Sequence, residues 1–109
     1  FYKISDIQNY DLKSKYLIFS GIGDPSYFKD LLLENKFDIV KELIFPDHYE
    51  YNLGDFEKIK SNAKNEKLKI ITTEKDYMKV PYEFKKEIDY LTIDLVLKDE
   101  DKLVELLNY

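Results

Sequence analysis

The sequence contains no cysteine, and it has only one histidine among 109 residues. Without cysteine there is no disulfide, no thiolate metal site and no cysteine nucleophile, which fits a reducing compartment. A single histidine also leaves too few of the usual ligands for a zinc site. We therefore expect no metal site built by this chain.

An excess of basic residues is also missing. Lysine and arginine number 17 against 22 acidic residues, which gives a net charge of −5. This balance is unlike the basic footprint of nucleic-acid-binding proteins, so we expect no nucleic-acid partner. No apolar run approaches the ~18–20 residues that span a bilayer, and no signal peptide is visible. The chain begins with Phe1 rather than methionine, so we expect it to be part of a longer protein.

What the chain does have is hydrophobic side chains, at 44% of the sequence with seven Phe and ten Tyr. This content can fill one core and excludes disorder. The length suits one domain and is too short for two.

Short apolar runs predict four strands, at residues 16–20, 37–45, 68–72 and 88–97. The helical spacing of Phe28, Leu31 and Leu32 predicts a helix from Pro25 to about residue 36, capped by Asp24. A second helix is expected after residue 52, and a closing helix at residues 99–108. Residues 77–86 are expected to be irregular or short-helical, and residues 1–15 to be a linker or an edge strand.

The start of the second helix has a sequence signature of its own. Asn52 is a predicted N-cap with Asp55 in a capping-box position. Beyond it, one apolar face is expected over roughly three turns, formed by Leu53, Phe56, Ile59 and Ala63.

Alternating strands and helices predict an α/β fold. We expect a layered sandwich with a mostly parallel sheet of about four strands and helices on both faces, formed by residues 16–109. Functional loops in such sheets lie at the carboxyl ends of the strands. Here these are residues 21–25, 47–51 and 72–76, which we expect to meet at one edge.

The first of these loops is a glycine turn that leads into a helix. Gly21 and Gly23 expose backbone N–H groups at a helix N-terminus, which suits a phosphate. The same pattern is found in ordinary strand-to-helix turns. Ser26 replaces the third glycine of a dinucleotide fingerprint, and the carboxylate of Asp24 would repel an anion. Ligand contact and a plain turn therefore both remain open at this point.

The other two loops hold polar side chains. His48 stands beside Asp47, and an imidazole is a side chain that suits proton transfer, although a lone histidine can also be structural. The segment at residues 72–76, which contains Thr73, Glu74 and Lys75, forms either a helix N-cap with local ion pairs or a polar loop that faces a nucleotide or a neighbouring domain. No Walker A motif and no nucleophile elbow is present.

Taken together, the three loops resemble one family. Residues 21–28 (GIGDPSYF), 45–51 (FPDHYEY) and 72–79 (TTEKDYMK) are similar, in order and approximate spacing, to three stretches in the C-terminal part of the tetraacyldisaccharide 4'-kinases. This chain differs by having Asp24 where the family often has Asn, and Tyr49 where it commonly has a second His.

The resemblance implies a P-loop kinase of two α/β lobes, of which this chain is the C-terminal one. The family transfers the γ-phosphate of ATP to the 4'-hydroxyl of a lipid disaccharide 1-phosphate and forms lipid IVA. It implies catalytic roles for His48, which works with an aspartate of the other lobe, and for Asp47 beside it. It leaves Gly21, Gly23, Thr73, Glu74 and Lys75 as candidates that line the site.

The same resemblance implies the cofactors and partners. ATP and Mg²⁺ would be bound mainly by the N-terminal P-loop lobe, which also makes the membrane contact, and neither is expected in this stretch alone. The enzyme would act at the cytoplasmic face of the bacterial inner membrane as a peripheral protein. Two alternatives are a free-standing phosphate- or nucleotide-binding module that uses residues 21–24, and an interaction domain that docks a partner through Tyr49 and Tyr51.

Overall fold

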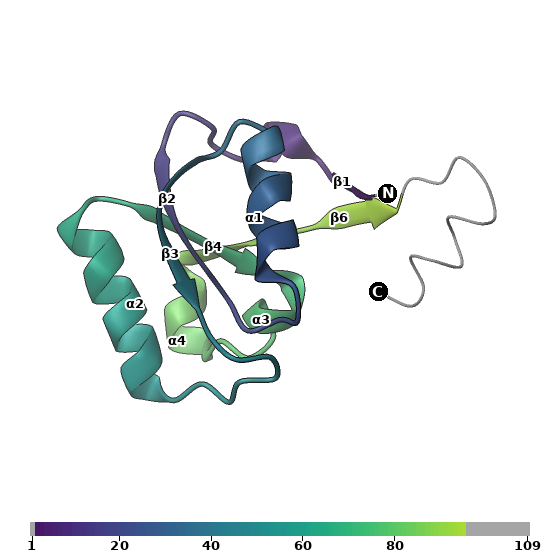
Figure 1. Cartoon of the computed structure of the whole chain (residues 1–109). Helices are drawn as coiled ribbons and strands as arrows, with labels where there is room; N and C mark the ends of the chain where they lie inside the picture. The colour runs from purple at the N-terminus through teal and green to yellow at the C-terminus, as the bar shows by residue number, and fades with distance from the viewer. Residues whose placement is uncertain (1, 96–109) are drawn as a thin grey trace.

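In the computed structural model, which describes residues 2–95, four strands form one parallel sheet (Figure 1). They are β2 (Lys15–Ser20), β3 (Asp38–Ile44), β4 (Lys69–Thr73) and β5 (Ile88–Leu91). Their order across the sheet is β3-β2-β4-β5, and every neighbouring pair is parallel. This confirms the predicted α/β class and its parallel sheet.

The central strand β2 is buried on both faces, which explains its unbroken run of apolar residues. Tyr16 and Ile18 pack on the face that α1 (Pro25–Glu34) covers. Leu17 and Phe19 pack on the opposite face, beneath α2 (Leu53–Asn65). Helices therefore cover both faces of the sheet, as predicted.

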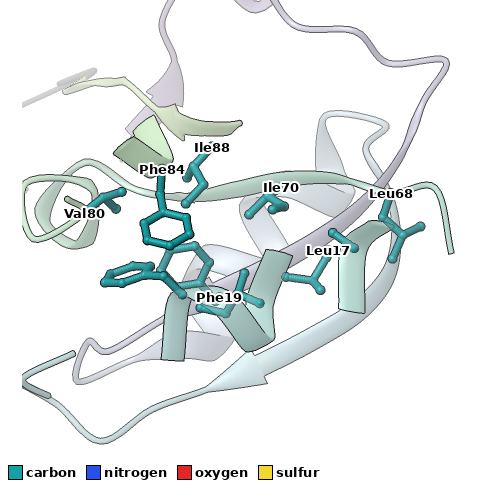
Figure 2. Close-up of a cluster of buried hydrophobic side chains, with 10 residues drawn as sticks. Leu17, Phe19, Leu68, Ile70, Val80, Phe84 and Ile88 are labelled. Atoms are coloured by element: carbon teal, nitrogen blue, oxygen red, sulfur yellow. The ribbon is translucent and has the colours of Figure 1, made fainter. Parts of the chain in front are cut away.

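The cluster on the α2 side is shown in Figure 2, where Leu17, Phe19 and Ile70 of the sheet and Phe84 belong to the same group of buried side chains. Phe84 lies in α4 (Tyr82–Lys85), a one-turn helix that begins just after Pro81. Another short helix, α3 (Glu74–Tyr77), follows β4 directly. Residues 77–86 were expected to be irregular or short-helical, and the single turn of α4 after Pro81 agrees with this.

Both predicted helix starts are confirmed at the level of single hydrogen bonds. The Asp24 side chain accepts a 3.1 Å hydrogen bond from the N–H of Tyr27, and Pro25 opens the helix. Asn52 and Asp55 exchange two hydrogen bonds of 2.9 Å, which completes the capping box of α2. These bonds satisfy N–H groups that a helix start leaves without intrahelical partners.

The prediction of one strand at residues 88–97 is wrong. The chain forms β5 and then β6 (Ile93–Leu95), which pairs antiparallel with β1 (Tyr2–Ile4) in a separate two-stranded ribbon. The break lies at Thr92, whose C=O accepts from the N–H of Ser5 at 2.8 Å and whose N–H donates to the Tyr10 hydroxyl at 3.1 Å. The N-terminal segment thus takes the chain out of the main sheet.

That segment, residues 1–15, was expected to be a linker or an edge strand. It contains β1 and a short 3-10 helix, η1 (Ile7–Asn9), before β2 begins at Lys15. The predicted closing helix at residues 99–108 lies outside the described residues.

The strand order also fixes where a site can form. After β2 the chain forms β3 on one side of β2, and it then crosses over to form β4 on the other side of β2. Connections that diverge in this way open a crevice at the carboxyl ends of the two central strands, where ligands bind in sheets of this kind. The loops that follow β2 and β4 border this crevice.

Candidate functional site

A pocket of about 770 Å³ lies at this carboxyl edge of the sheet. Its polar lining comes from all three predicted loops and includes six of the seven residues that the sequence singles out: Gly23, Asp47, His48, Thr73, Glu74 and Lys75. Its apolar lining includes Phe28 and Leu31 of α1 and Leu91 and Ile93 at the far wall. The expected convergence of the loops is therefore observed.

Gly21 is the candidate that does not line the pocket. It is buried beneath it, and its N–H lies 3.1 Å from both carboxylate oxygens of Asp76. A Cβ at this position would meet the Pro46 carbonyl oxygen at 3.1 Å and the Tyr51 hydroxyl at 3.2 Å. Gly21 is therefore closely packed on the side where a Cβ would lie, and it supports the site from below.

His48 is held in an unusual conformation at the pocket rim. Its φ of 60° lies in the left-handed region, which non-glycine residues rarely adopt. Its N–H donates a 3.2 Å hydrogen bond to the Gly21 carbonyl. The side chain is 75% exposed, and its Nε2 lies 3.7 Å from Oδ2 of Asp47. The backbone is thus fixed by its surroundings while the imidazole is open to a ligand.

The third loop combines a structural and a rim role. The Thr73 hydroxyl accepts from the N–H of Asp76 at 3.0 Å and caps α3, which confirms the N-cap interpretation. Glu74 and Lys75 are exposed at the rim of the pocket. Within residues 2–95 neither of them forms an ion pair, so the expectation of local ion pairs is wrong. Their charges face solvent and the pocket.

Sequence reasoning missed one residue of this site, Asp76. It belongs to the third family-like stretch, residues 72–79. Charged residues precede it there, so its composition does not indicate that it is buried. In the structure it is completely buried, and its oxygens accept hydrogen bonds from Gly21, Tyr51 and Thr73. Its position three residues after a helix-capping threonine was the available signal.

The structure also corrects the interpretation of Tyr51, which one alternative placed on a surface that docks a partner. Its ring is partly buried and packs against Phe19, Phe45 and Phe56, with centroids 5.1 to 5.8 Å apart. Burial, followed by the charge of Asp76, raises the pKa of the Tyr51 hydroxyl. Tyr51 is therefore a neutral donor that points inward, and it does not form part of a partner surface.

The glycine turn is poorly suited to a phosphate. The N–H of Gly21 is already bonded to Asp76, and the N–H of Tyr27 in the first turn of α1 is bonded to Asp24. These are groups that an anion at a helix start would need. The structure thus argues against the free-standing phosphate-binding alternative.

Within residues 2–95, no group of three or more His, Asp or Glu side chains is placed to hold a metal ion. None of the helices there has the length and apolar character needed to cross a membrane.

Comparison with known proteins agrees with the geometry. The family described as tetraacyldisaccharide-1-P 4'-kinase matches residues 3–109. The chain is 43% identical over 102 residues to the tetraacyldisaccharide 4'-kinase of Pelagibacter ubique, covering 94% of this chain and 32% of the relative. It is 42% identical over 98 residues to that of Rickettsia typhi, covering 89% and 30%. No solved structure matches the chain.

The chain spans about a third of the length of these relatives, and the match falls in their C-terminal part. The family match covers nearly all of the sequence, including the three loops that build the pocket. The chain therefore belongs to the tetraacyldisaccharide-1-P 4'-kinase family.

Proposed function

We propose that this chain is the C-terminal lobe of a longer kinase that transfers the γ-phosphate of ATP to the 4'-hydroxyl of a lipid A disaccharide 1-phosphate, forming lipid IVA. The relatives are named for this acceptor. The observation that carries the proposal is the placement of His48 and Asp47 at the rim of a pocket built from all three family-like loops. Residues 1–109 alone are expected to transfer no phosphate.

The chemistry assigns a separate role to each of the two side chains. His48 accepts the proton of the 4'-hydroxyl as that oxygen forms its bond to the γ-phosphorus and the bond to the ADP oxygen breaks. The Asp47 carboxylate, 3.7 Å from Nε2, stabilises the imidazolium that results. An aspartate of the other lobe shares this work. Thr73, Glu74, Lys75 and Gly23 line the acceptor side.

The left-handed backbone at His48 supports this assignment. A non-glycine residue at φ 60° costs of the order of 1–3 kcal/mol and persists only where the surroundings enforce it. Such strain is concentrated at functional sites. At His48 it places the imidazole at the pocket rim instead of against the loop.

ATP and Mg²⁺ are assigned to the rest of the longer protein. The residues described here do not fit a Mg²⁺ site, because no group of three acidic or histidine side chains is close enough. The chain also has no Walker A motif to hold the phosphates of ATP. In this proposal the other lobe also makes the membrane contact, at the cytoplasmic face of the bacterial inner membrane.

The test is His48→Asn in the full-length protein, with transfer of labelled γ-phosphate to the disaccharide as the readout. Asparagine accepts the left-handed conformation readily but cannot take up the proton. Loss of a general base lowers the rate about 10²- to 10⁴-fold. Glu50→Gln is the matched control, because Glu50 lies in the same loop, is exposed and does not line the pocket. Normal turnover by His48→Asn would remove His48 from the mechanism.

A further inference from the structure

Asp76 is the one acidic side chain, among those the structure describes, that is completely buried. Removing a carboxylate from water is unfavourable unless hydrogen bonds replace its hydration. Within residues 2–95, Asp76 has no ion-pair partner, so hydrogen bonds alone compensate for its burial. A buried carboxylate of this kind fixes the positions of its hydrogen-bond donors, because a donor that moved away would leave a carboxylate oxygen without a partner.

The partners of Asp76 come from the ends of three adjacent strands. The N–H of Gly21, after β2, lies 3.1 Å from both oxygens. The hydroxyl of Tyr51, beyond β3, donates to Oδ1 at 3.0 Å. The hydroxyl of Thr73, at the end of β4, donates to Oδ2 at 2.6 Å. One carboxylate therefore joins all three loops that form the pocket.

Two of these partners hold the segment that contains His48. Gly21, whose N–H is fixed by Asp76, accepts the N–H of His48 at its own carbonyl, at 3.2 Å. Tyr51, three residues after His48, is fixed by Asp76 through its hydroxyl. His48, whose φ is positive, is thus held by Gly21 on one side and by the nearby Tyr51 on the other, and both of these residues are hydrogen-bonded to Asp76.

We propose that Asp76 is a positioning residue that holds His48 in its left-handed conformation and so sets the place of the imidazole at the pocket. This inference rests on the proposed function, in which His48 is the general base. Asp76 does not line the pocket. It acts through Gly21 and Tyr51.

The charge matters because every partner is a donor. Asparagine keeps the shape of Asp76 but replaces one oxygen with an NH₂ group. Since the Gly21 N–H is equally close to both oxygens, an NH₂ at either position opposes it. We expect the Gly21 peptide to shift away from the NH₂ group, and His48 to shift with it.

The experiment is a double-mutant cycle in the full-length enzyme with Asp76→Asn and His48→Asn. Displacement of a reacting group by about 1 Å can lower a rate about 10²-fold. We therefore expect Asp76→Asn to reduce kcat about 10- to 100-fold with KM little changed. In the His48→Asn background the same substitution should cause no further loss, because the group that it positions is absent.

Equal losses in both backgrounds, or wild-type kcat for Asp76→Asn, would overturn the inference and leave the proposed function standing. Wild-type kcat for His48→Asn would instead overturn the proposed function. If Asp76→Asn does not fold, Tyr51→Phe takes its place in the cycle, since it removes only one hydroxyl. Its expected effect is smaller, about 3- to 10-fold in kcat, and it must likewise vanish without His48. Asp89→Asn, an exposed acidic residue on β5, is the control for loss of charge.

Discussion

The hydroxyl of Tyr51 donates a 3.0 Å hydrogen bond to a carboxylate oxygen of Asp76, and the two residues are 25 positions apart in the chain. Tyr51 belongs to the loop that contains His48, whereas Asp76 belongs to α3. The bond thus ties the loop beyond β3 to the helix beyond β4. Gly21 lies against the same pair of side chains, so a side chain added at this position would press on both of them.

Gly21→Ala is expected to destabilise the protein by about 1–3 kcal/mol, the range for overpacking a filled interior. The new methyl group would meet the Pro46 carbonyl oxygen at 3.1 Å, and that backbone atom cannot move aside easily. Urea unfolding measures the effect. Gly23→Ala is the control, because its nearest contact is Oδ2 of Asp47 at 3.4 Å and its φ is not positive. Equal stability of the two variants would contradict the packing argument.

His48→Gly should separate stability from activity. The left-handed conformation costs a non-glycine residue about 1–2 kcal/mol, and glycine avoids this cost but loses about 0.5–1 kcal/mol through chain entropy. We expect a net gain of about 0.5–1 kcal/mol in unfolding free energy together with loss of phosphate transfer. Denaturant midpoints and turnover of the full-length protein measure the two effects. A loss of stability would show that the loop is not strained.

Lys36→Gly is expected to stabilise the protein by about 0.5–1 kcal/mol. Lys36 follows α1 with φ 71°, and its N–H bonds to the Leu33 carbonyl in a helix-ending turn. Glycine is preferred at this position because it adopts a positive φ without strain. The control is Lys58→Gly inside α2, where glycine should cost about 1 kcal/mol. Thermal unfolding of both variants should therefore shift the melting temperature in opposite directions.

Stability should fall as the pH rises from 10 to 12. Burial, followed by the nearby charges of Asp89 and Asp11, raises the pKa of Tyr16 from 10.0 to about 12. The unfolded chain therefore loses this proton first, so the stabilisation is complete below pH 10 and is lost as the pH passes through about 12. Tyr16→Phe should make stability less dependent on pH in this range. Tyr82→Phe, at a side chain that is 83% exposed, should behave as wild type.

The parts of the fold that follow from short-range patterns were predictable. The caps at Asp24 and Asn52 depend only on residues three positions away, and β2 is recognisable because both of its faces are apolar. The break at Thr92 was not predictable, because its hydrogen bonds go to Ser5 and Tyr10 at the other end of the chain. Long-range pairing decided the outcome there against a continuous apolar pattern.

The same division holds for the candidate site. The rim residues, such as His48 and Lys75, were identified because polar side chains follow predicted strands. The support beneath them was not, since the burial of Asp76 depends on Gly21, which lies 55 positions away in sequence. In the local sequence, only the capping threonine three residues earlier distinguishes this acidic residue from the many that are exposed.

The ribbon of β1 and β6 determines how the described part of the chain responds to movement at its ends. Tyr2 pairs with Leu95, so the first and last described residues lie next to each other (Figure 1). Pulling these ends apart would separate the residue pairs of the ribbon one after another, starting with Tyr2 and Leu95. The four-stranded sheet would come under load only afterwards. Because Ile93 belongs both to the ribbon and to the pocket wall, opening the ribbon would remove support from the apolar side of the pocket.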